Sequence, residues 1–432
     1  MAKVFLLSLG CPKNLVDSEK LLRKLGDKGI AHSSTAEDSD IIVVNTCGFI
    51  EEAKRESIEE ILRVAELKKA GEKKKKLLVY GCLAKRFGGE LKDEIPEIDR
   101  LWGVGDDDEI VRYCEKVAGP GVIRGKESRA GRRILTDKPY AYLKIAEGCD
   151  RGCSYCVIPN IRGAFRSREE NDIINEAEDL LRCGVRELIL VAQDITSYGK
   201  EKDGSDLSGL IKKISSLKGD FWIRLLYLYP TAINNSLLEV IAAEEKVCKY
   251  IDMPLQHSED RILRLMARGG GRAYYEKLVR KIRAMIPNVI IRTTFIVGFP
   301  QESEEDSKNL AVFVRKMKFD RMGAFVYSKE QDTTASRLKG QIPKSVKKSR
   351  YERLMEIQSA VSLSKNKALV GHTFKALVDE VENDVAIARL YSQAPEIDGV
   401  VIIEQEEIEK GTFVNVRITK PFDYDLKGVL VK

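Results

Sequence analysis

The sequence is poor in histidine and lacks the long apolar segments that membranes require. Only three of its 432 residues are histidines, which argues against chemistry that needs several imidazoles. They are His32, His257 and His372. No apolar run approaches the roughly 20 residues of a membrane-spanning helix. The first residues, "MAKVFLLSLGCPKN", have no long apolar h-region and no small-residue cleavage site, and they predict a first β-strand rather than a secretion signal.

A disulfide framework is also disfavoured, because the nine cysteines are odd in number and no secretion signal is predicted. We therefore expect a cytoplasmic protein whose reduced thiols act as ligands, catalysts or core residues. Hydrophobic residues make up 43% of the chain and charged residues 32%, which is typical of a soluble globular protein. The chain is too long for one ordinary core, so its length predicts two or three domains.

Residues 1–118 alternate between strand-like and helix-like patterns. The apolar runs "KVFLLSLG", "DIIVVNTCG" and "KKLLVYGC" are separated by two helical stretches. This β-α-β-α-β order predicts a doubly wound parallel sheet flanked by helices. The glycine-rich and basic segment at 119–134 is expected to be a linker or an exposed hairpin.

Residues 135–366 carry a second β/α series. Helical segments separate six apolar runs: "YAYLKIAEG", "RELILVAQD", "DFWIRLLYLYP", "KYIDMPLQH", "NVIIRTTFIVGFP" and "DRMGAFVYS". Six strands with helical crossovers predict a partial (β/α)6 barrel, and a charged helix is expected at about 345–367. The final segment, 367–432, has short alternating runs rich in valine and isoleucine, which predict a small β-barrel or sandwich.

The stretch "EGCDRGCSYCVIPNIRG" places three cysteines within eight residues: Cys149, Cys153 and Cys156. Incidental thiols seldom cluster in this way, and zinc needs a fourth ligand, for which His257 is a distant candidate. An iron–sulfur cluster is the alternative, because thiolates bind such clusters well. Three cysteines on a four-iron cluster leave one iron open to a substrate or cofactor.

The spacing Cys-x-x-x-Cys-x-x-Cys, with Tyr155 before the last cysteine and a barrel strand before the first, resembles the signature of radical S-adenosylmethionine (SAM) enzymes. The resemblance implies that the open iron chelates SAM and that one electron cleaves SAM to methionine and a 5′-deoxyadenosyl radical. Iron–sulfur clusters reach potentials as low as about −700 mV, so this reduction is feasible.

A second set of three cysteines follows three predicted strands of the first domain. Cys11, Cys47 and Cys82 come after "VFLLSLG", "IIVVNT" and "LLVYG". Ligands bind beyond the carboxyl ends of parallel strands, so these thiols are candidates to converge, although buried cysteines are also common at strand ends. "SLGCPKNLVDSE", "NTCGFIEEAKRES" and "YGCLAKR" resemble the amino-terminal domain of methylthiotransferases, which implies a second, auxiliary [4Fe-4S] cluster on this trio. The remaining Cys114, Cys183 and Cys248 are expected to be structural.

The resemblance to methylthiotransferases covers essentially the whole chain, and "PLQHSEDRILRLMARGG" and "APEIDG" are similar to the RimO type. It implies that the last segment is an antiparallel barrel of the TRAM type. It also implies insertion of sulfur and a methyl group at a carbon–hydrogen bond, with one SAM as methyl donor and a second as radical source. The RimO type acts on an aspartate β-carbon in protein twelve of the small ribosomal subunit. An electron donor, such as a flavodoxin-like protein, is a further implied partner.

Polar residues near the carboxyl ends of the barrel strands are the candidates for SAM contacts. They are Tyr155, Gln193 with Asp194, Arg224 with Tyr227, Gln256 with His257, Thr294 with Gly298, and Tyr327. By resemblance, Tyr155 lies on the adenine side and Gln193 near the methionine moiety. Each has a structural alternative: Arg224 pairs with a carboxylate, Thr294 packs in its strand, and "GFP" with Glu302 forms a turn and helix cap. No catalytic residue is predicted beyond the cluster ligands.

The charge of the last segment bears on the acceptor. Between residues 367 and 432, eight Lys and Arg face twelve Asp and Glu, whereas the whole chain carries a net charge of +6. An RNA-binding module should be basic, so an acidic one favours a basic ribosomal protein, with residues around Asp398 as candidate contacts. Direct RNA binding and a membrane partner are not expected. The alternatives are a methylthiotransferase of transfer-RNA adenosine and, outside enzymes, a zinc-dependent ribosome-binding scaffold.

Overall fold

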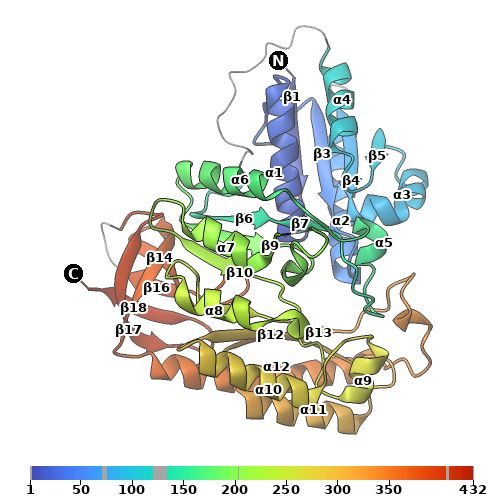
Figure 1. The fold of residues 1–432 in the computed structure, drawn as a ribbon. Coiled ribbons are helices and arrows are strands. Elements are labelled where there is room, and N and C mark those ends of the chain that lie inside the picture. Colours follow the sequence, from blue (N-terminus) through green and yellow to red (C-terminus); the bar gives the residue numbers. More distant parts are fainter. Residues whose placement is uncertain (1, 71–74, 120–133, 203, 405–407, 432) are drawn as a thin grey trace. The chain divides into compact units, whose positions relative to one another are not determined.

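The computed structural model describes residues 2–70, 75–119, 134–202, 204–404 and 408–431 (Figure 1). The chain divides into two compact units. The amino-terminal unit comprises Met1–Asp137, Glu147–Asp150 and Val157–Ala164, and the carboxyl-terminal unit comprises Lys138–Ala146, Arg151–Cys156 and Phe165–Lys432. The predicted linker at 119–134 lies, apart from its two end residues, outside the described residues.

A five-stranded parallel sheet forms the centre of the amino-terminal unit. Its strand order is β2 (Ala31–His32), β1 (Lys3–Ser8), β3 (Ile41–Thr46), β4 (Lys76–Gly81) and β5 (Arg100–Trp102). The helices of this unit are α1 (Pro12–Asp27), α2 (Glu51–Ala70), α3 (Cys82–Glu94), α4 (Asp107–Ala118) and α5 (Ile158–Arg162). Because β1 pairs with both β2 and β3, the order reverses at β1, as in doubly wound folds.

Helices cover both faces of this sheet, which confirms the doubly wound prediction. One apolar cluster joins α2 and α3 to the sheet through residues such as Ile61 and Leu83. A second cluster, on the other side chains of the same strands, joins α1 and α4 through Leu21 and Ile110. The run "IIVVNT" of β3 is buried at every position, as a strand covered on both faces must be.

Six parallel strands form an open barrel in the carboxyl-terminal unit, and all six coincide with predicted runs. One sheet contains β6 (Tyr140–Lys144), β9 (Glu187–Val191) and β10 (Trp222–Leu225), and the other β11 (Tyr250–Asp252), β12 (Ile290–Val297) and β13 (Arg321–Val326). A parallel bridge between Ile223 and Val247 continues the pairing from β10 towards β11. The strands therefore follow one another in chain order, which is the arrangement of a partial (β/α)6 barrel.

Helices and short elements connect these strands, and η3 and α12 follow the last of them (Figure 1). The helices are α6 (Glu170–Arg182), α7 (Leu207–Ser215), α8 (Asn235–Ala243), α9 (Asp260–Leu265), α10 (Arg272–Met285), α11 (Glu304–Met317) and α12 (Lys344–Ala368). The short elements are β7 (Ala146–Glu147), β8 (Arg166–Ser167), η1 (Ile195–Ser197), η2 (Pro230–Ala232) and η3 (Ala335–Arg337). At the start of α11, Ser303 and Asp306 form a capping box, so this helix begins where the sequence supplies its own cap.

The last segment closes into a five-stranded barrel, as expected. Its order is β14 (Thr373–Glu382), β15 (Val385–Leu390), β16 (Val401–Glu404), β18 (Leu426–Leu430) and β17 (Phe413–Pro421). Between β16 and β18 the pairing is parallel, whereas the other described pairs are antiparallel as predicted. Alternate residues such as Ala386, Ala388 and Leu390 of β15 fill the interior.

Candidate functional site

Three cysteines lie at the carboxyl ends of the neighbouring strands β1, β3 and β4. Cys11 caps α1 after β1, Cys47 follows β3 directly, and Cys82 is the first residue of α3 after β4. Since these parallel strands are hydrogen-bonded neighbours, their ends meet at one edge of the sheet. The topology alone therefore brings three thiols from distant parts of the sequence to one place.

The side chain of Asn14 shows that two of these thiols share one pocket. Its Oδ1 atom accepts from the Cys11 Sγ at 3.8 Å and from the Cys82 Sγ at 3.9 Å. The amide cannot turn away, because its Nδ2 donates to the carbonyl oxygens of Leu9, at 2.9 Å, and Thr46, at 3.1 Å. The buried Asn14 thus marks the point on which Cys11 and Cys82 converge.

Cys47 is fixed on the same edge by backbone contacts. The Ser57 hydroxyl accepts from the Cys47 N–H at 3.0 Å and donates to the Cys47 carbonyl at 3.1 Å. Gly10 has φ +88°, and a Cβ there would lie 2.5 Å from the Cys47 Cβ, so only glycine permits this approach. Burial, with smaller contributions from Cys11 and Cys82, raises the pKa of the Cys47 thiol to about 11.

A buried arginine completes this group. Arg162, the last residue of α5, donates from Nη2 to Asn14 Oδ1 at 2.6 Å and to Cys82 Sγ at 3.7 Å. Its Nη1 pairs with Glu147 at 2.9 Å and with Asp17 at 3.2 Å. Burial raises the pKa of the Cys82 thiol, and the Arg162 guanidinium acts in the opposite direction. The pocket therefore contains a cation that favours thiolate.

These residues suit an iron–sulfur cluster better than a single ion. Nowhere in the described ranges do three or more His, Cys, Asp or Glu side chains form a group that could hold one metal ion. A four-iron cluster is wider than one ion and takes its protein ligands from thiolates. Two thiols on one amide, a third thiol close enough to interact electrostatically with both, and a guanidinium to balance negative charge fit such a cluster.

The second trio lies on one loop, and the residues of this loop belong partly to each of the two compact units. Cys149 belongs to the amino-terminal unit, and Cys153 and Cys156 to the carboxyl-terminal unit. Cys149 is held by its N–H, which donates to the Gly163 carbonyl at 3.1 Å. Gly148 before it has φ +77°, and a Cβ there would lie 2.1 Å from the carbonyl oxygen of Ala164. The loop therefore requires glycine immediately before its first cysteine.

Within the carboxyl-terminal unit, Ser154 anchors the loop between Cys153 and Cys156. Its N–H donates to Met266 O at 3.0 Å, and its hydroxyl donates to Leu265 O at 2.7 Å. Arg268 donates from Nη1 to Cys153 Sγ at 3.8 Å. Each trio thus has a guanidinium beside one of its thiols.

Two of the predicted SAM residues lie in one apolar cluster of the carboxyl-terminal unit. Tyr327, which follows β13, packs with Phe299 and Met266, and Tyr155 packs against this cluster. The rings of Phe299 and Tyr327 meet edge to face with 5.3 Å between centroids. Burial raises the pKa of Tyr155 well above its ordinary value, so its hydroxyl stays protonated. This arrangement offers flat apolar surface next to the cysteine loop.

The polar candidates fall at neighbouring strand ends. Gln193 follows β9 and is half-buried. Gln256, after β11, donates its N–H to the Thr294 carbonyl at 2.8 Å, which places these two predicted residues side by side. Next to Gln193, the Asp194 carboxylate accepts from Arg151 Nε and from Thr196 N, both at 2.9 Å. Asp194 therefore holds its own loop in place.

Arg224 has contacts that favour the structural alternative. Its fully buried guanidinium pairs with Glu187 at 2.5 Å and donates to Tyr391 O at 2.8 Å. Glu187 also pairs with Arg389 of β15, at 2.7 Å, and Arg389 pairs with Asp379. Burial would raise the pKa of Glu187, but the two arginines lower it. Arg224 thus joins the open barrel to the carboxyl-terminal barrel.

Asp398 is also sequestered rather than available to a partner. Its carboxylate accepts from Tyr250 Oη at 2.6 Å and from Ala394 N at 2.9 Å, and it lies 3.7 Å from Arg292 Nε. Its side chain is 2% exposed. Asp398 itself is therefore used inside the carboxyl-terminal unit, and target contact by the acidic residues around it stays a prediction.

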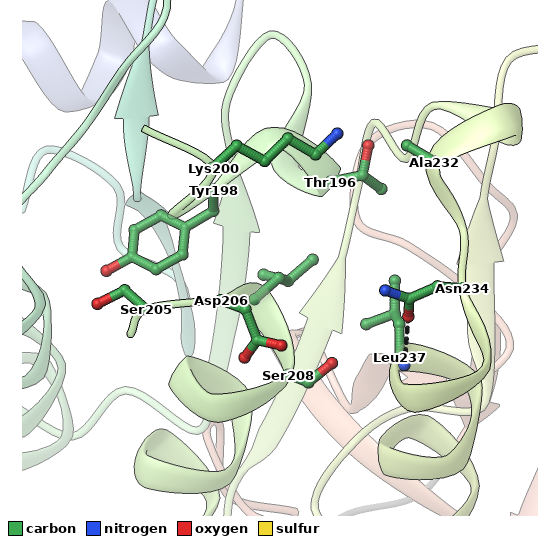
Figure 2. A pocket seen from close by; sticks show the side chains of 10 residues that line it. Thr196, Tyr198, Lys200, Ser205, Asp206, Ser208, Ala232, Asn234 and Leu237 are labelled. Atoms are coloured by element: carbon green, nitrogen blue, oxygen red, sulfur yellow. Dashed lines mark hydrogen bonds between the residues drawn. The ribbon is translucent and has the colours of Figure 1, made fainter. Parts of the chain in front are cut away.

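A surface pocket lies elsewhere on this unit (Figure 2). It is bordered by the loop after β9 and by the first turns of α7 and α8, where Asp206 and Asn234 cap the helices. Figure 2 shows Lys200 and the hydroxyls of Tyr198, Ser205 and Ser208 around it. None of the predicted SAM residues lines this pocket.

Sequence reasoning missed four residues that fix the thiols: Asn14, Ser57, Arg162 and Arg268. Asn14 stands three positions after Cys11 in "CPKN", and Arg162 ends "PNIR", so both lie inside stretches that were singled out for their cysteines. Their polar side chains within those stretches were the available signal. Ser57 and Arg268 also lie inside stretches quoted for the family resemblance, "NTCGFIEEAKRES" and "PLQHSEDRILRLMARGG", but nothing in those stretches indicates contacts with Cys47 or Cys153, which are 10 and 115 residues away.

Comparison with known proteins identifies the family. Three known protein families match successive parts of the sequence. They are "Uncharacterized protein family UPF0004" at residues 3–103, the Radical SAM superfamily at 143–314 and the TRAM domain at 370–431. A relative from Thermodesulfovibrio yellowstonii, named ribosomal protein uS12 methylthiotransferase RimO, is 48% identical over 432 residues and covers 100% of both chains. The chain belongs to the RimO family of radical SAM methylthiotransferases. A RimO relative from Clostridium botulinum is 46% identical, with 99% of this chain and 98% of its own length aligned.

Solved structures support the fold of this RimO family member. The radical SAM methyltransferase TsrM from Kitasatospora setae has a TM-score of 0.57 at 13% identity, over 75% of this chain and 73% of its own. The cobalamin-dependent radical SAM enzyme OxsB has a TM-score of 0.52 at 11% identity, over 84% and 56%. Membership of the radical SAM superfamily implies SAM and a [4Fe-4S] cluster. In the part of the chain that the structure describes, no helix has the length and apolarity to cross a bilayer.

Proposed function

We propose that this chain transfers a methylthio group to the β-carbon of an aspartate in ribosomal protein uS12, using two [4Fe-4S] clusters and two molecules of SAM. The RimO relatives support this acceptor, since their names give uS12 as the protein on which they act. The observation that carries the proposal is the convergence of Cys11 and Cys82 on Asn14 Oδ1, with Cys47 close enough to interact electrostatically with both.

The two trios would hold the two clusters. Cys149, Cys153 and Cys156 bind one, and Cys11, Cys47 and Cys82 bind the other. A four-iron cluster with three thiolate ligands supplies an open iron site and, in the radical SAM case, a low-potential electron. The apolar cluster around Tyr155 and Tyr327 would receive the adenine of SAM, and Gln193, Gln256 and Thr294 would contact its polar groups. Arg224 is left out of this set because its Nε and Nη1 atoms are committed to Glu187 and Tyr391.

The reaction replaces one β-hydrogen of aspartate by sulfur carrying a methyl group. One SAM gives its methyl group to the transferred sulfur and leaves as S-adenosylhomocysteine. The other accepts one electron and breaks into methionine and a 5′-deoxyadenosyl radical, which removes the β-hydrogen. The carbon–sulfur bond would then form between that carbon radical and the methylated sulfide, and the cluster that Cys11, Cys47 and Cys82 would hold would take up the one electron released. An electron donor such as a flavodoxin-like protein would supply the reducing equivalents.

The carboxyl-terminal barrel would bind the basic uS12. Asp379 and Asp398 are buried and paired, so they do not contribute to its surface charge. The turn between β14 and β15 instead exposes Glu382 and Asp384. Lysine substitution at both positions should weaken binding to uS12 without unfolding the chain, and unchanged affinity in a titration would contradict this role.

Anaerobic incubation with SAM, reductant, sulfide and both candidate acceptors tests the proposal. We expect mass spectrometry to show one methylthio group on uS12 and none on transfer RNA. Modified adenosine without modified uS12 would establish the RNA-modifying alternative. Metal analysis addresses the scaffold alternative, since colourless protein with stoichiometric zinc and no iron would contradict any cluster-based reaction.

A further inference from the structure

The helix α5 is placed so that Arg162 faces the Cys82 thiol. Val157 and Ile161 pack with Cys82 in one apolar cluster, to which Val104 contributes from the loop after β5. The helix ends at Gly163, which has φ +75°. Arg162 is therefore the last residue of a helix that is anchored on the first residue of α3.

Both terminal nitrogens of the Arg162 guanidinium form hydrogen bonds, on opposite sides of the group. Towards the cysteines, Nη2 donates to Asn14 Oδ1 at 2.6 Å and to Cys82 Sγ at 3.7 Å. On the opposite side, Nη1 lies 2.9 and 3.0 Å from the two carboxylate oxygens of Glu147 and 3.2 Å from Asp17 Oδ2. The Arg162 side chain is 2% exposed. Solvent therefore screens this charge only weakly, and its orientation is fixed.

A cation in this position acts on the charge of whatever the thiolates bind. Reduction of a thiolate-ligated iron–sulfur cluster adds one negative charge, and hydrogen bonds to sulfur and nearby charges set its reduction potential. A buried guanidinium with an N–H directed at a ligand sulfur stabilises the reduced form more than the oxidised form. The potential should therefore be higher with Arg162 than without it.

We propose that Arg162 is a positioning residue of the auxiliary cluster, which holds the Cys82 thiolate and raises the reduction potential of that cluster. Glu147 fixes the guanidinium from the segment that leads to Cys149, so the same arginine links residues flanking both cysteine trios. This inference rests on the proposed function, because it requires a cluster on Cys11, Cys47 and Cys82.

The test uses the full-length chain with Cys149→Ala, Cys153→Ala and Cys156→Ala, so that only the auxiliary cluster can form. After anaerobic reconstitution, iron content is determined and the cluster is titrated with reductant while its electron paramagnetic resonance signal is followed. Arg162→Gln should retain iron and shift the midpoint to a more negative potential. Arg162→Lys, which keeps the charge, should shift it less.

Two further variants separate charge from structure. Glu147→Gln removes a negative charge from the other side of the guanidinium, so it should shift the midpoint in the positive direction. Arg23→Gln removes a half-buried arginine that pairs with Asp27 on α1, and should leave the midpoint unchanged. A merely structural role would not produce shifts of opposite sign.

The outcomes distinguish this inference from the proposed function. If the parent variant binds no iron–sulfur cluster, the proposed auxiliary cluster fails and the inference with it. If the parent binds a cluster whose midpoint is the same in Arg162→Gln, the inference is wrong and the function stands. If Arg162→Gln loses its iron, the midpoint potential of Glu147→Gln is the deciding measurement. An unchanged or more negative midpoint potential in Glu147→Gln would overturn the inference.

Discussion

The two cysteine trios reach comparable surroundings by different routes. Cys149, Cys153 and Cys156 lie within eight residues on one loop, whereas Cys11, Cys47 and Cys82 come from the ends of three strands, 36 and 35 residues apart. Both trios have a buried or half-buried arginine beside one thiol, Arg162 at Cys82 and Arg268 at Cys153. A local motif fixes the spacing of its ligands by itself, but a dispersed site depends on the whole sheet.

This difference predicts how each trio responds to damage. The loop trio is set by backbone turns and by the anchoring of Ser154, so loss of one thiol affects that loop alone. The dispersed trio depends on Asn14, Ser57 and Arg162, which come from three helices far apart in sequence. Changes to these supports should therefore disturb the dispersed trio without any change to a cysteine.

The largest expected effect separates the two trios by chemistry. Cys153→Ser should abolish both cleavage of SAM to 5′-deoxyadenosine and methylthio transfer, to the level without enzyme. Cys82→Ser should retain SAM cleavage but lose methylthio transfer, because the radical is made at the other trio. Chromatography of 5′-deoxyadenosine and mass spectrometry of the acceptor measure the two activities. Cys183→Ser, at an exposed cysteine, is the control and should keep both SAM cleavage and methylthio transfer. Methylthio transfer by Cys82→Ser would contradict separate roles for the two trios.

A smaller effect is expected from Arg268→Gln. Outer residues that hydrogen-bond to metal ligands typically change metal affinity or activity by about 10–100-fold. The loss should appear in SAM cleavage, because Arg268 contacts Cys153, while the spectroscopic signal of the auxiliary cluster stays as in the parent. Arg264→Gln, on the exposed end of α9, is the matched control. An equal loss in both variants would show that Arg268 has no special relation to the loop trio.

The next smaller effect is a loss of stability of the cluster-free amino-terminal unit in the Asn14→Ala variant. The substitution removes both donors to the Leu9 and Thr46 carbonyls and the acceptor of Arg162, at a cost of about 1–3 kcal/mol in the free energy of unfolding. In a Trp222→Phe background, Trp102 alone reports unfolding of this unit in urea.

The exposed Asn235→Ala serves as its control, and should change the free energy of unfolding by no more than about 0.5 kcal/mol. If Asn14→Ala were equally silent, the amide would not be the support on which the dispersed trio depends.

The smallest effect concerns pH in the cluster-free protein. Burial raises the pKa of Cys47 from its ordinary value near 9 to about 11. A thiol whose pKa is raised by folding contributes stability that is complete below pH about 9 and is lost as the pH rises through about 11. Alkylation of Cys47, followed by mass spectrometry, should therefore have its midpoint near pH 11 in the folded chain and near 9 in urea. Coincident midpoints would contradict the burial of this thiol.

Much of the fold follows from apolar runs, and the exceptions have physical reasons. All six strands of the open barrel and the helix α12 coincide with sequence patterns, because buried strands and long helices leave strong periodic signals. The strands β2 and β5, with two and three residues, are too short to leave such a signal. The parallel pairing of β16 with β18 depends on barrel closure, which no local pattern specifies.

The candidate site divides in the same way. The convergence of Cys11, Cys47 and Cys82 could be predicted, because strand ends of a parallel sheet meet at one edge. Arg224 and Asp398 were interpreted from position and charge alone. Their actual partners, Glu187 and Tyr250, are 37 and 148 residues away, and no spacing rule connects them. Burial of a charge depends on partners that only the folded chain supplies.

The buried pairs of Glu187 with Arg224 and Arg389 also limit how this chain can be recombined. Glu187 and Arg224 belong to the open barrel, and Arg389 to the terminal one. A chimera that grafts a foreign terminal barrel lacking the Arg389 counterpart would remove one of the two arginine partners of the fully buried Glu187 and leave only Arg224 to compensate its charge. A chimera made to exchange acceptor specificity between relatives therefore has to keep both the glutamate of the open barrel and the arginine of the terminal barrel. These two modules would then have to be transferred, and to evolve, together.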